Sequence, residues 1–62
     1  MLMKFIGEDY LIGRKKGRIY ECLIDEIGDY IWLTYYESGL NNPSIPYSSY
    51  EELYENWEKV GE

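Results

Sequence analysis

The chain has 62 residues, with twelve acidic and six basic side chains, no histidine and one cysteine. A chain of this length forms a single domain, 1–62, and leaves no room for a deep substrate pocket beside its core. The lone Cys22 excludes an intrachain disulfide, and a zinc site made of cysteine and histidine ligands is excluded as well. We therefore expect no enzyme activity, no catalytic residues, no metal and no cofactor.

The distribution of apolar residues and the free thiol bear on where the protein works. A single cysteine without a disulfide framework is typical of a reducing cytoplasm. The apolar start, Met1–Ile6, is short and lacks the basic beginning and the cleavage site of a signal peptide. No apolar run approaches the roughly 20 residues of a membrane span. We expect a cytoplasmic protein with no membrane contact.

The first half of the chain predicts two strands separated by a long loop. Residues 3–6 form the first strand, and residues 7–17 form an excursion that holds a basic, glycine-flanked segment. Residues 18–25 form the second strand, whose period of two separates two faces. One face is uniformly apolar and should point to the core; it consists of Tyr20, Cys22 and Ile24. The other is mixed and should be half exposed; it consists of Ile19, Glu21, Leu23 and Asp25.

A turn at residues 27–29, with Gly28 supplying a positive φ, leads into a third strand over residues 30–37. Ile31, Leu33 and Tyr35 form its better core face. The reverse face is amphipathic, with large rings that have polar tips; it consists of Tyr30, Trp32, Thr34 and Tyr36. These rings are too numerous for an ordinary solvent-facing strand, so the C-terminal helix at 49–57, the loop at 8–16 or a partner should cover them.

The C-terminal third predicts an edge strand, a helix and a short closing strand. Residues 44–47 are extended, and Pro46 confines them to an edge because it cannot donate a ladder hydrogen bond. Residues 49–57 form a helix with one apolar stripe at positions i, i+3, i+4 and i+7. Its capping box is either Ser49 with Glu52 or Ser48 with Glu51. Residues 58–60 can then close the sheet.

These elements predict a mainly β fold, a small antiparallel barrel or strongly bent sheet of about five strands with one short helix at about 49–57. Tyr20, Cys22, Ile24, Ile31 and Leu33 should be buried. The larger side chains assigned to the core are Phe5, Tyr20, Tyr50, Leu53 and Trp57. The rings left at least partly exposed are Tyr10, Tyr30, Trp32, Tyr36, Tyr47 and Tyr54.

Three segments, 4–7, 16–23 and 28–33, read K-F-I-G, K-G-R-I-Y-E-C-L and G-D-Y-I-W-L. In this order they resemble a group of short, mostly uncharacterised SH3-like barrel proteins of low-GC bacteria and their phages. The resemblance implies a strongly bent five-stranded barrel whose first long loop corresponds to the RT-type loop. It implies no catalytic residues. The chain departs from that group at 46–60, where a full helical stripe replaces a short turn, and this bears on whether a groove beside the loop is open.

The leading hypothesis for function is a protein-binding module whose surface combines rings with nearby acids: Tyr30, Trp32, Tyr36, Glu21 and Glu37. The rings would anchor a protein partner and the acids would steer its basic surface. One alternative is a phage-encoded acidic inhibitor of a host nucleic-acid enzyme, since twelve acids on a small scaffold can imitate phosphates. A second alternative is weak nucleic-acid binding through a basic loop and one ring, which the net charge of −6 opposes. Its residues are Tyr10, Arg14, Lys15, Lys16 and Arg18.

The strands 3–6 and 44–47 both look like sheet edges, so the sequence leaves open a monomer or a weak homodimer.

Overall fold

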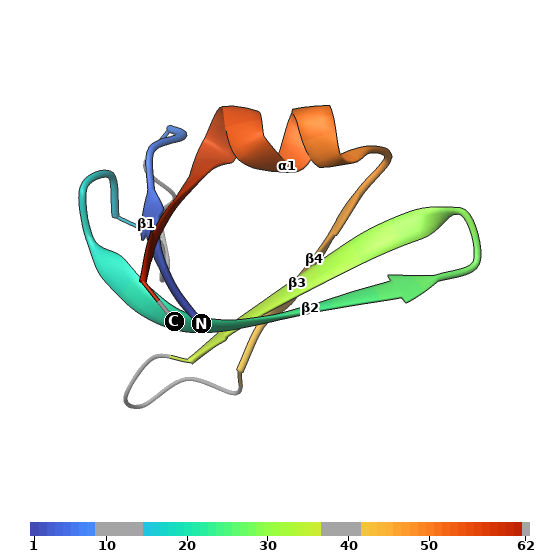
Figure 1. Ribbon diagram of the computed structural model, residues 1–62, viewed down its shortest axis with the longest axis horizontal. Coiled ribbons are helices and arrows are strands. Elements are labelled where there is room, and N and C mark those ends of the chain that lie inside the picture. Colours follow the sequence, from blue (N-terminus) through green and yellow to red (C-terminus); the bar gives the residue numbers. More distant parts are fainter. Residues whose placement is uncertain (9–14, 37–41, 62) are drawn as a thin grey trace.

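A computed structural model describes residues 1–8, 15–36 and 42–61 of the chain. Within these residues five strands and one helix follow one another in the order β1, β2, β3, β4, α1, β5 (Figure 1). Their bounds are Leu2–Phe5 for β1, Ile19–Ile27 for β2, Tyr30–Tyr36 for β3, Ser44–Tyr47 for β4, Tyr50–Asn56 for α1 and Trp57–Gly61 for β5. The predicted mainly β fold with one short C-terminal helix is confirmed.

The five strands form one antiparallel sheet in the order β4-β3-β2-β1-β5. The strands at the two ends, β4 and β5, do not pair with each other, so the sheet is open. Figure 1 shows that it is strongly bent. Figure 1 shows α1 lying over the concave side of the bend. The sheet therefore has an inner face toward the helix and a convex face on its other side.

The core lies between the inner face and α1, and it contains Met3, Phe5, Tyr20, Cys22, Leu33, Tyr35, Tyr47, Leu53 and Trp57. Trp57 is at its centre, with no exposed surface. The ring of Trp57 lies 5.1 Å from that of Phe5 and 5.9 Å from that of Tyr20, both edge-on. Edge-to-face ring pairs contribute about 0.5–1.5 kcal/mol each beyond the area they bury. Clustered rings thus give a small chain, whose single cysteine cannot form an intrachain disulfide, a dense core.

The helix begins at one of the two predicted caps, Ser49 with Glu52, but the return hydrogen bond of the box is shifted by one residue. The Ser49 hydroxyl accepts a hydrogen bond from the Glu52 backbone N–H at 3.1 Å. The Glu52 carboxylate in turn accepts from the Ser48 backbone N–H at 3.0 Å, one residue before the cap. The helix spans only seven residues. Trp57, predicted as its last residue, is instead the first residue of β5, and this junction brings its ring into the core.

Of the five residues of β2 and β3 that were predicted to be buried, three are buried and two are only partly buried. Tyr20, Cys22 and Leu33 are buried, as expected. Ile24 and Ile31, also predicted to be buried, are partly buried and pack against the edge of the core.

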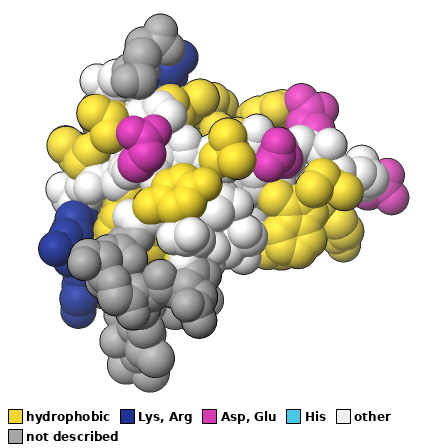
Figure 2. All heavy atoms as spheres, turned by 90° about the horizontal axis from the view of Figure 1, so that it is seen from below, with side chains coloured by type: hydrophobic (Ala, Val, Ile, Leu, Met, Phe, Trp, Pro, Cys, Tyr) yellow, Lys and Arg dark blue, Asp and Glu magenta, His cyan; other side chains and the backbone are white. Residues whose placement is uncertain are grey.

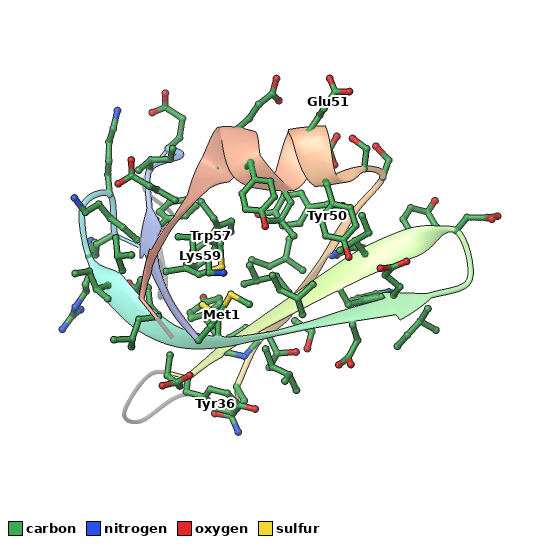
Figure 3. The ribbon with its side chains drawn as sticks, viewed as in Figure 1. Met1, Tyr36, Tyr50, Glu51, Trp57 and Lys59 are labelled. Atoms are coloured by element: carbon green, nitrogen blue, oxygen red, sulfur yellow. The ribbon has the colours of Figure 1, made fainter. Side chains whose placement is uncertain are left out.

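Two rings are placed differently from the sequence prediction. Tyr50, assigned to the core, is 41% exposed, because the helix turns Leu53 inward and leaves Tyr50 and Tyr54 stacked on its flank. Tyr47, expected to be at least partly exposed, is buried, because pairing with Ile31 turns it to the inner face. Figure 3 shows Tyr50 and Trp57 on the helix side of the sheet and Tyr36 on the opposite side.

The prediction that the first strand is an edge is wrong. β1 lies between β2 and β5, since the closing strand pairs along it from Leu2↔Gly61 to Phe5↔Trp57. β4 is an edge, as Pro46 predicted, and β5 is the other.

Candidate functional site

The β2–β3 hairpin projects beyond the helix and builds the broad convex surface of the molecule (Figure 1). Ile27 pairs with Tyr30, so Gly28 and Asp29 alone form the turn. Gly28 has a φ of +61°, whereas Asp29 is not in the left-handed region. This places glycine at the first central position, as type II′ turns require, and the twist of such turns suits a hairpin. The turn fixes the register of the two longest strands.

The register brings four cross-strand pairs onto the convex side: Ile27↔Tyr30, Asp25↔Trp32, Leu23↔Thr34 and Glu21↔Tyr36. We call these eight residues the outer face. They alternate along each strand with the core residues, so the outer face points away from α1. The sequence left open whether the C-terminal helix or the loop at 8–16 covers Tyr30, Trp32 and Tyr36. The structure places α1 on the opposite side of the sheet, and residues 9–14 of the loop lie outside the described residues.

The outer face is exposed although it is largely apolar. Tyr30 is 52% exposed and Tyr36 42%, and on the neighbouring strand Leu23 is 50% and Ile27 61% exposed. Trp32 is partly buried and lies between Asp25 of β2 and Pro46 of β4. Figure 2 looks onto this side of the molecule and shows hydrophobic side chains spread across it, with acidic side chains among them. Contiguous exposed apolar side chains on a small protein are typical of an interaction site.

The polar tips of the three rings have no hydrogen-bond partner within the described part of the chain. These groups are the hydroxyls of Tyr30 and Tyr36 and the indole N–H of Trp32. The buried Trp57 differs, since its indole N–H donates to the Tyr47 hydroxyl at 3.0 Å. Buried polar groups in proteins are almost always paired, whereas exposed ones are left to water or to a ligand. Among residues 1–8, 15–36 and 42–61, therefore, no group occupies the polar tips of the outer rings.

The two acids of the outer face are in different states. A carboxylate oxygen of Glu21 accepts a hydrogen bond from the Met1 ammonium at 2.6 Å, and the same ammonium donates to the Cys22 carbonyl at 3.0 Å. No described residue forms an ion pair or hydrogen bond with the Asp25 side chain. Glu21 was predicted as a partner-binding acid, but the terminal ammonium already neutralises it. Asp25 is the outer-face acid that has no partner in the part of the chain that the structure describes.

The other predicted site residues are placed elsewhere or lie outside the described residues. Glu37, Tyr10 and Arg14 belong to segments that the structure does not describe. Lys15, Lys16 and Arg18 are exposed. They lie beside the end of β1, where the Gly17 N–H donates to the Phe5 carbonyl at 2.7 Å. Arg18 lies one residue before β2 and three residues before Glu21, about 10 Å at 3.3 Å per residue. The described basic residues therefore lie near the Glu21 end of the outer face, and Asp25 and the hairpin turn lie farther along β2.

Sequence reasoning missed part of the outer face. Ile27 was assigned to the turn, although it is the last residue of β2. The period of two along β2 already placed Leu23 and Asp25 beside Glu21. Extending the same alternation by one pair would have added Ile27.

The helix is tied to the hairpin on the inner side. The Tyr50 hydroxyl donates to the Glu26 carboxylate at 2.6 Å, and this hydrogen bond raises the pKa of Tyr50 above its ordinary value. Asp25 and Glu26 are neighbours in sequence but point to opposite faces. One acid therefore helps to hold the fold, and the other faces outward.

The thiol of Cys22 has the properties of a core residue. It is buried, and burial raises its pKa to about 11, with a smaller increase from Glu21 and a decrease from the terminal ammonium. A thiol with this pKa is protonated at neutral pH and is a poor nucleophile.

The described residues contain no cluster of three or more side chains able to hold a metal ion. They enclose no pocket. No helix within the described ranges is long and apolar enough to cross a membrane.

Comparison of the chain with protein-family models, with curated proteins and with solved structures gives no match. Inferences about function therefore rest on the chain's own residues and their geometry.

Proposed function

We propose that this chain is a non-enzymatic, SH3-like protein-binding module that contacts a protein partner through its outer face. The observation that supports this most directly is the set of rings on β3, the exposed Tyr30 and Tyr36 and the partly buried Trp32, with the exposed aliphatic side chains of Leu23 and Ile27 beside them on β2. Tyrosine and tryptophan are enriched at protein interfaces because they provide large contact area and lose few rotatable bonds. The five-stranded antiparallel sheet, with its helix between β4 and β5, is compatible with a barrel-like domain of this class.

Charge defines the kind of partner. The outer face contains two acids and no base among its eight residues, and the chain as a whole has a net charge of −6. A partner with basic residues around an apolar patch would therefore be attracted at long range and would fit on contact. The rings supply the binding energy at the centre of this interface, and the acids supply orientation and association rate.

The experiment uses two tyrosine variants with nearly equal exposure. Tyr30, on the outer face, is 52% exposed, and Tyr54, on the helix flank, is 46% exposed. The tagged chain is used to capture partners from a lysate of the source organism, and the affinity of the captured protein is then measured for Tyr30→Ala, Trp32→Ala and Tyr54→Ala. Loss of a central ring commonly costs about 2 kcal/mol of binding, which is roughly thirtyfold in affinity.

We expect that loss for Tyr30→Ala and Trp32→Ala and less than about a twofold change for Tyr54→Ala. Far-ultraviolet circular dichroism and thermal unfolding establish that each variant is folded. If folded Tyr30→Ala and Trp32→Ala bind every captured protein as tightly as the wild type does, the outer face is not the contact surface.

A second candidate function has its own supporting observation. The helix and the residues that follow present a row of exposed acids, Glu51, Glu52, Glu55 and Glu58, and α1 itself contains no basic residue. Such a row suits an acidic inhibitor that occupies the nucleic-acid site of an enzyme. In that case Glu51→Gln combined with Glu55→Gln would abolish capture of a nucleic-acid enzyme, and Trp32→Ala would leave it intact.

Nucleic-acid binding through the basic residues at 14–18 stays a prediction from sequence, and a gel shift at low salt tests it.

A further inference from the structure

On the outer face, each acid lies directly opposite an aromatic ring. The register pairs Asp25 with Trp32 and Glu21 with Tyr36. Residues directly opposite in an antiparallel pair have Cβ atoms about 4.5–5.5 Å apart, so a carboxylate and a ring share one patch of surface. The hairpin therefore presents the same arrangement twice, four residues apart along β2.

One of the two arrangements already holds a cation. The Met1 ammonium lies 2.6 Å from a carboxylate oxygen of Glu21, on the pair that includes Tyr36. The Asp25 carboxylate has no cation in the described ranges, and the indole N–H of Trp32 has no acceptor there. The neighbours of this pair on the outer face are Leu23, Ile27, Tyr30 and Thr34, none of them basic. An exposed carboxylate is thus set among apolar and aromatic side chains without a partner.

We propose that Asp25 and Trp32 form a binding position for the guanidinium group of an arginine in the partner. This inference rests on the proposed protein-binding function and specifies the side chain that the outer face recognises. A guanidinium group is planar and weakly hydrated, so it stacks on an indole ring while it donates two hydrogen bonds to a carboxylate. A lysine ammonium is a compact, strongly hydrated charge and cannot make both contacts equally well. The position therefore selects arginine over lysine.

The first test compares capped tetra-arginine and tetra-lysine peptides, which have equal charge. Binding is followed by NMR through the two indole N–H signals of the ¹⁵N-labelled chain. Trp57 is fully buried and serves as an internal reference, whereas Trp32 should respond to ligand. We expect the arginine peptide to bind about tenfold more tightly and to shift the Trp32 signal selectively.

Matched charge variants separate a specific site from general attraction. Asp25→Asn and Asp29→Asn each remove one exposed carboxylate from the hairpin, but only Asp25 lies opposite Trp32. We expect Asp25→Asn to lower the affinity for tetra-arginine to that for tetra-lysine, and Asp29→Asn to change it by less than about twofold. Equal affinity for the two peptides, or equal effects of the two variants, would overturn the inference. A Trp32 signal that changes with protein concentration alone would do so too, because a second copy would then occupy the position.

Failure of the arginine-recognition inference can be distinguished from failure of the proposed protein-binding function. If captured partners still require Tyr30 and Trp32 but bind Asp25→Asn as tightly as the wild type, the outer face is the interface and arginine recognition is wrong. If arginine is selected at Asp25 and Trp32 and captured partners are lost on Asp25→Asn, both statements hold.

Discussion

Two buried rings of the core are joined by a hydrogen bond. The indole N–H of Trp57 donates to the hydroxyl oxygen of Tyr47, at 3.0 Å between nitrogen and oxygen. We predict that Tyr47→Phe lowers the free energy of unfolding by about 1–3 kcal/mol, because the buried indole N–H loses its acceptor while the ring volume is kept. Urea denaturation measures this. The control is Tyr36→Phe, which removes an exposed hydroxyl and should cost less than about 0.5 kcal/mol. A Tyr47→Phe variant as stable as the control would mean that the indole finds another acceptor.

Single rings are also where sequence reasoning was least reliable. Tyr47 and Tyr50 were assigned to the wrong environments because a tyrosine suits either one, with an apolar body for the core and a hydroxyl for water. The helical stripe at i, i+3, i+4 and i+7 includes both the buried line through Leu53 and the flank formed by Tyr50 and Tyr54. Which of these faces inward depends on where β4 and β5 hold the ends of the helix. That information is not local in sequence.

At the scale of elements, the β2–β3 hairpin depends on Gly28, whose φ is +61°. A Cβ at this position would meet no atom within 4 Å, so the cost of Gly28→Ala is the backbone conformation alone. We predict a loss of about 1–2 kcal/mol in the free energy of unfolding. Gly61→Ala is the control, since its Cβ would make only ordinary contacts with Leu2 at 3.9 and 4.0 Å and its φ is not in the left-handed region. Thermal unfolding compares the two, and equal losses would contradict this account.

Elements whose partners are close in sequence were predicted well. The hairpin follows from alternating residues around a glycine turn, and the helix start follows from Ser49 and Glu52. The same alternation along β2 and β3 accounts for Glu21, Trp32 and Tyr36 lying together on the outer face. The position of β1 was predicted wrongly because its second neighbour, β5, lies more than fifty residues away in sequence. A period of two identifies a strand's faces but does not identify the strand next to it.

At the scale of the whole molecule, charge is unevenly distributed. The helix α1 contains exposed acids and no base, the bases Lys15, Lys16 and Arg18 cluster before β2, and the net charge is −6. The ion pair between the Lys4 ammonium and the Glu58 carboxylate is 3.9 Å long and exposed on both sides, so it compensates little of this excess. Like charges on so small a surface repel one another in the folded state more than in the expanded chain. Salt should therefore affect folding and binding in opposite directions.

We predict that raising sodium chloride from about 0.01 M to about 0.15 M increases the free energy of unfolding by up to about 1 kcal/mol, because the screening length falls from about 30 Å to about 8 Å. Over the same range the affinity for a basic partner should fall, since the steering attraction is screened as well. Urea denaturation and a binding titration at matched salt concentrations measure the two effects. Glu55→Lys changes the net charge from −6 to −4, because one negative charge is replaced by one positive charge, and should reduce the salt-induced gain in stability. A stability that falls with salt would mean that attractive pairs outweigh repulsion in the folded chain.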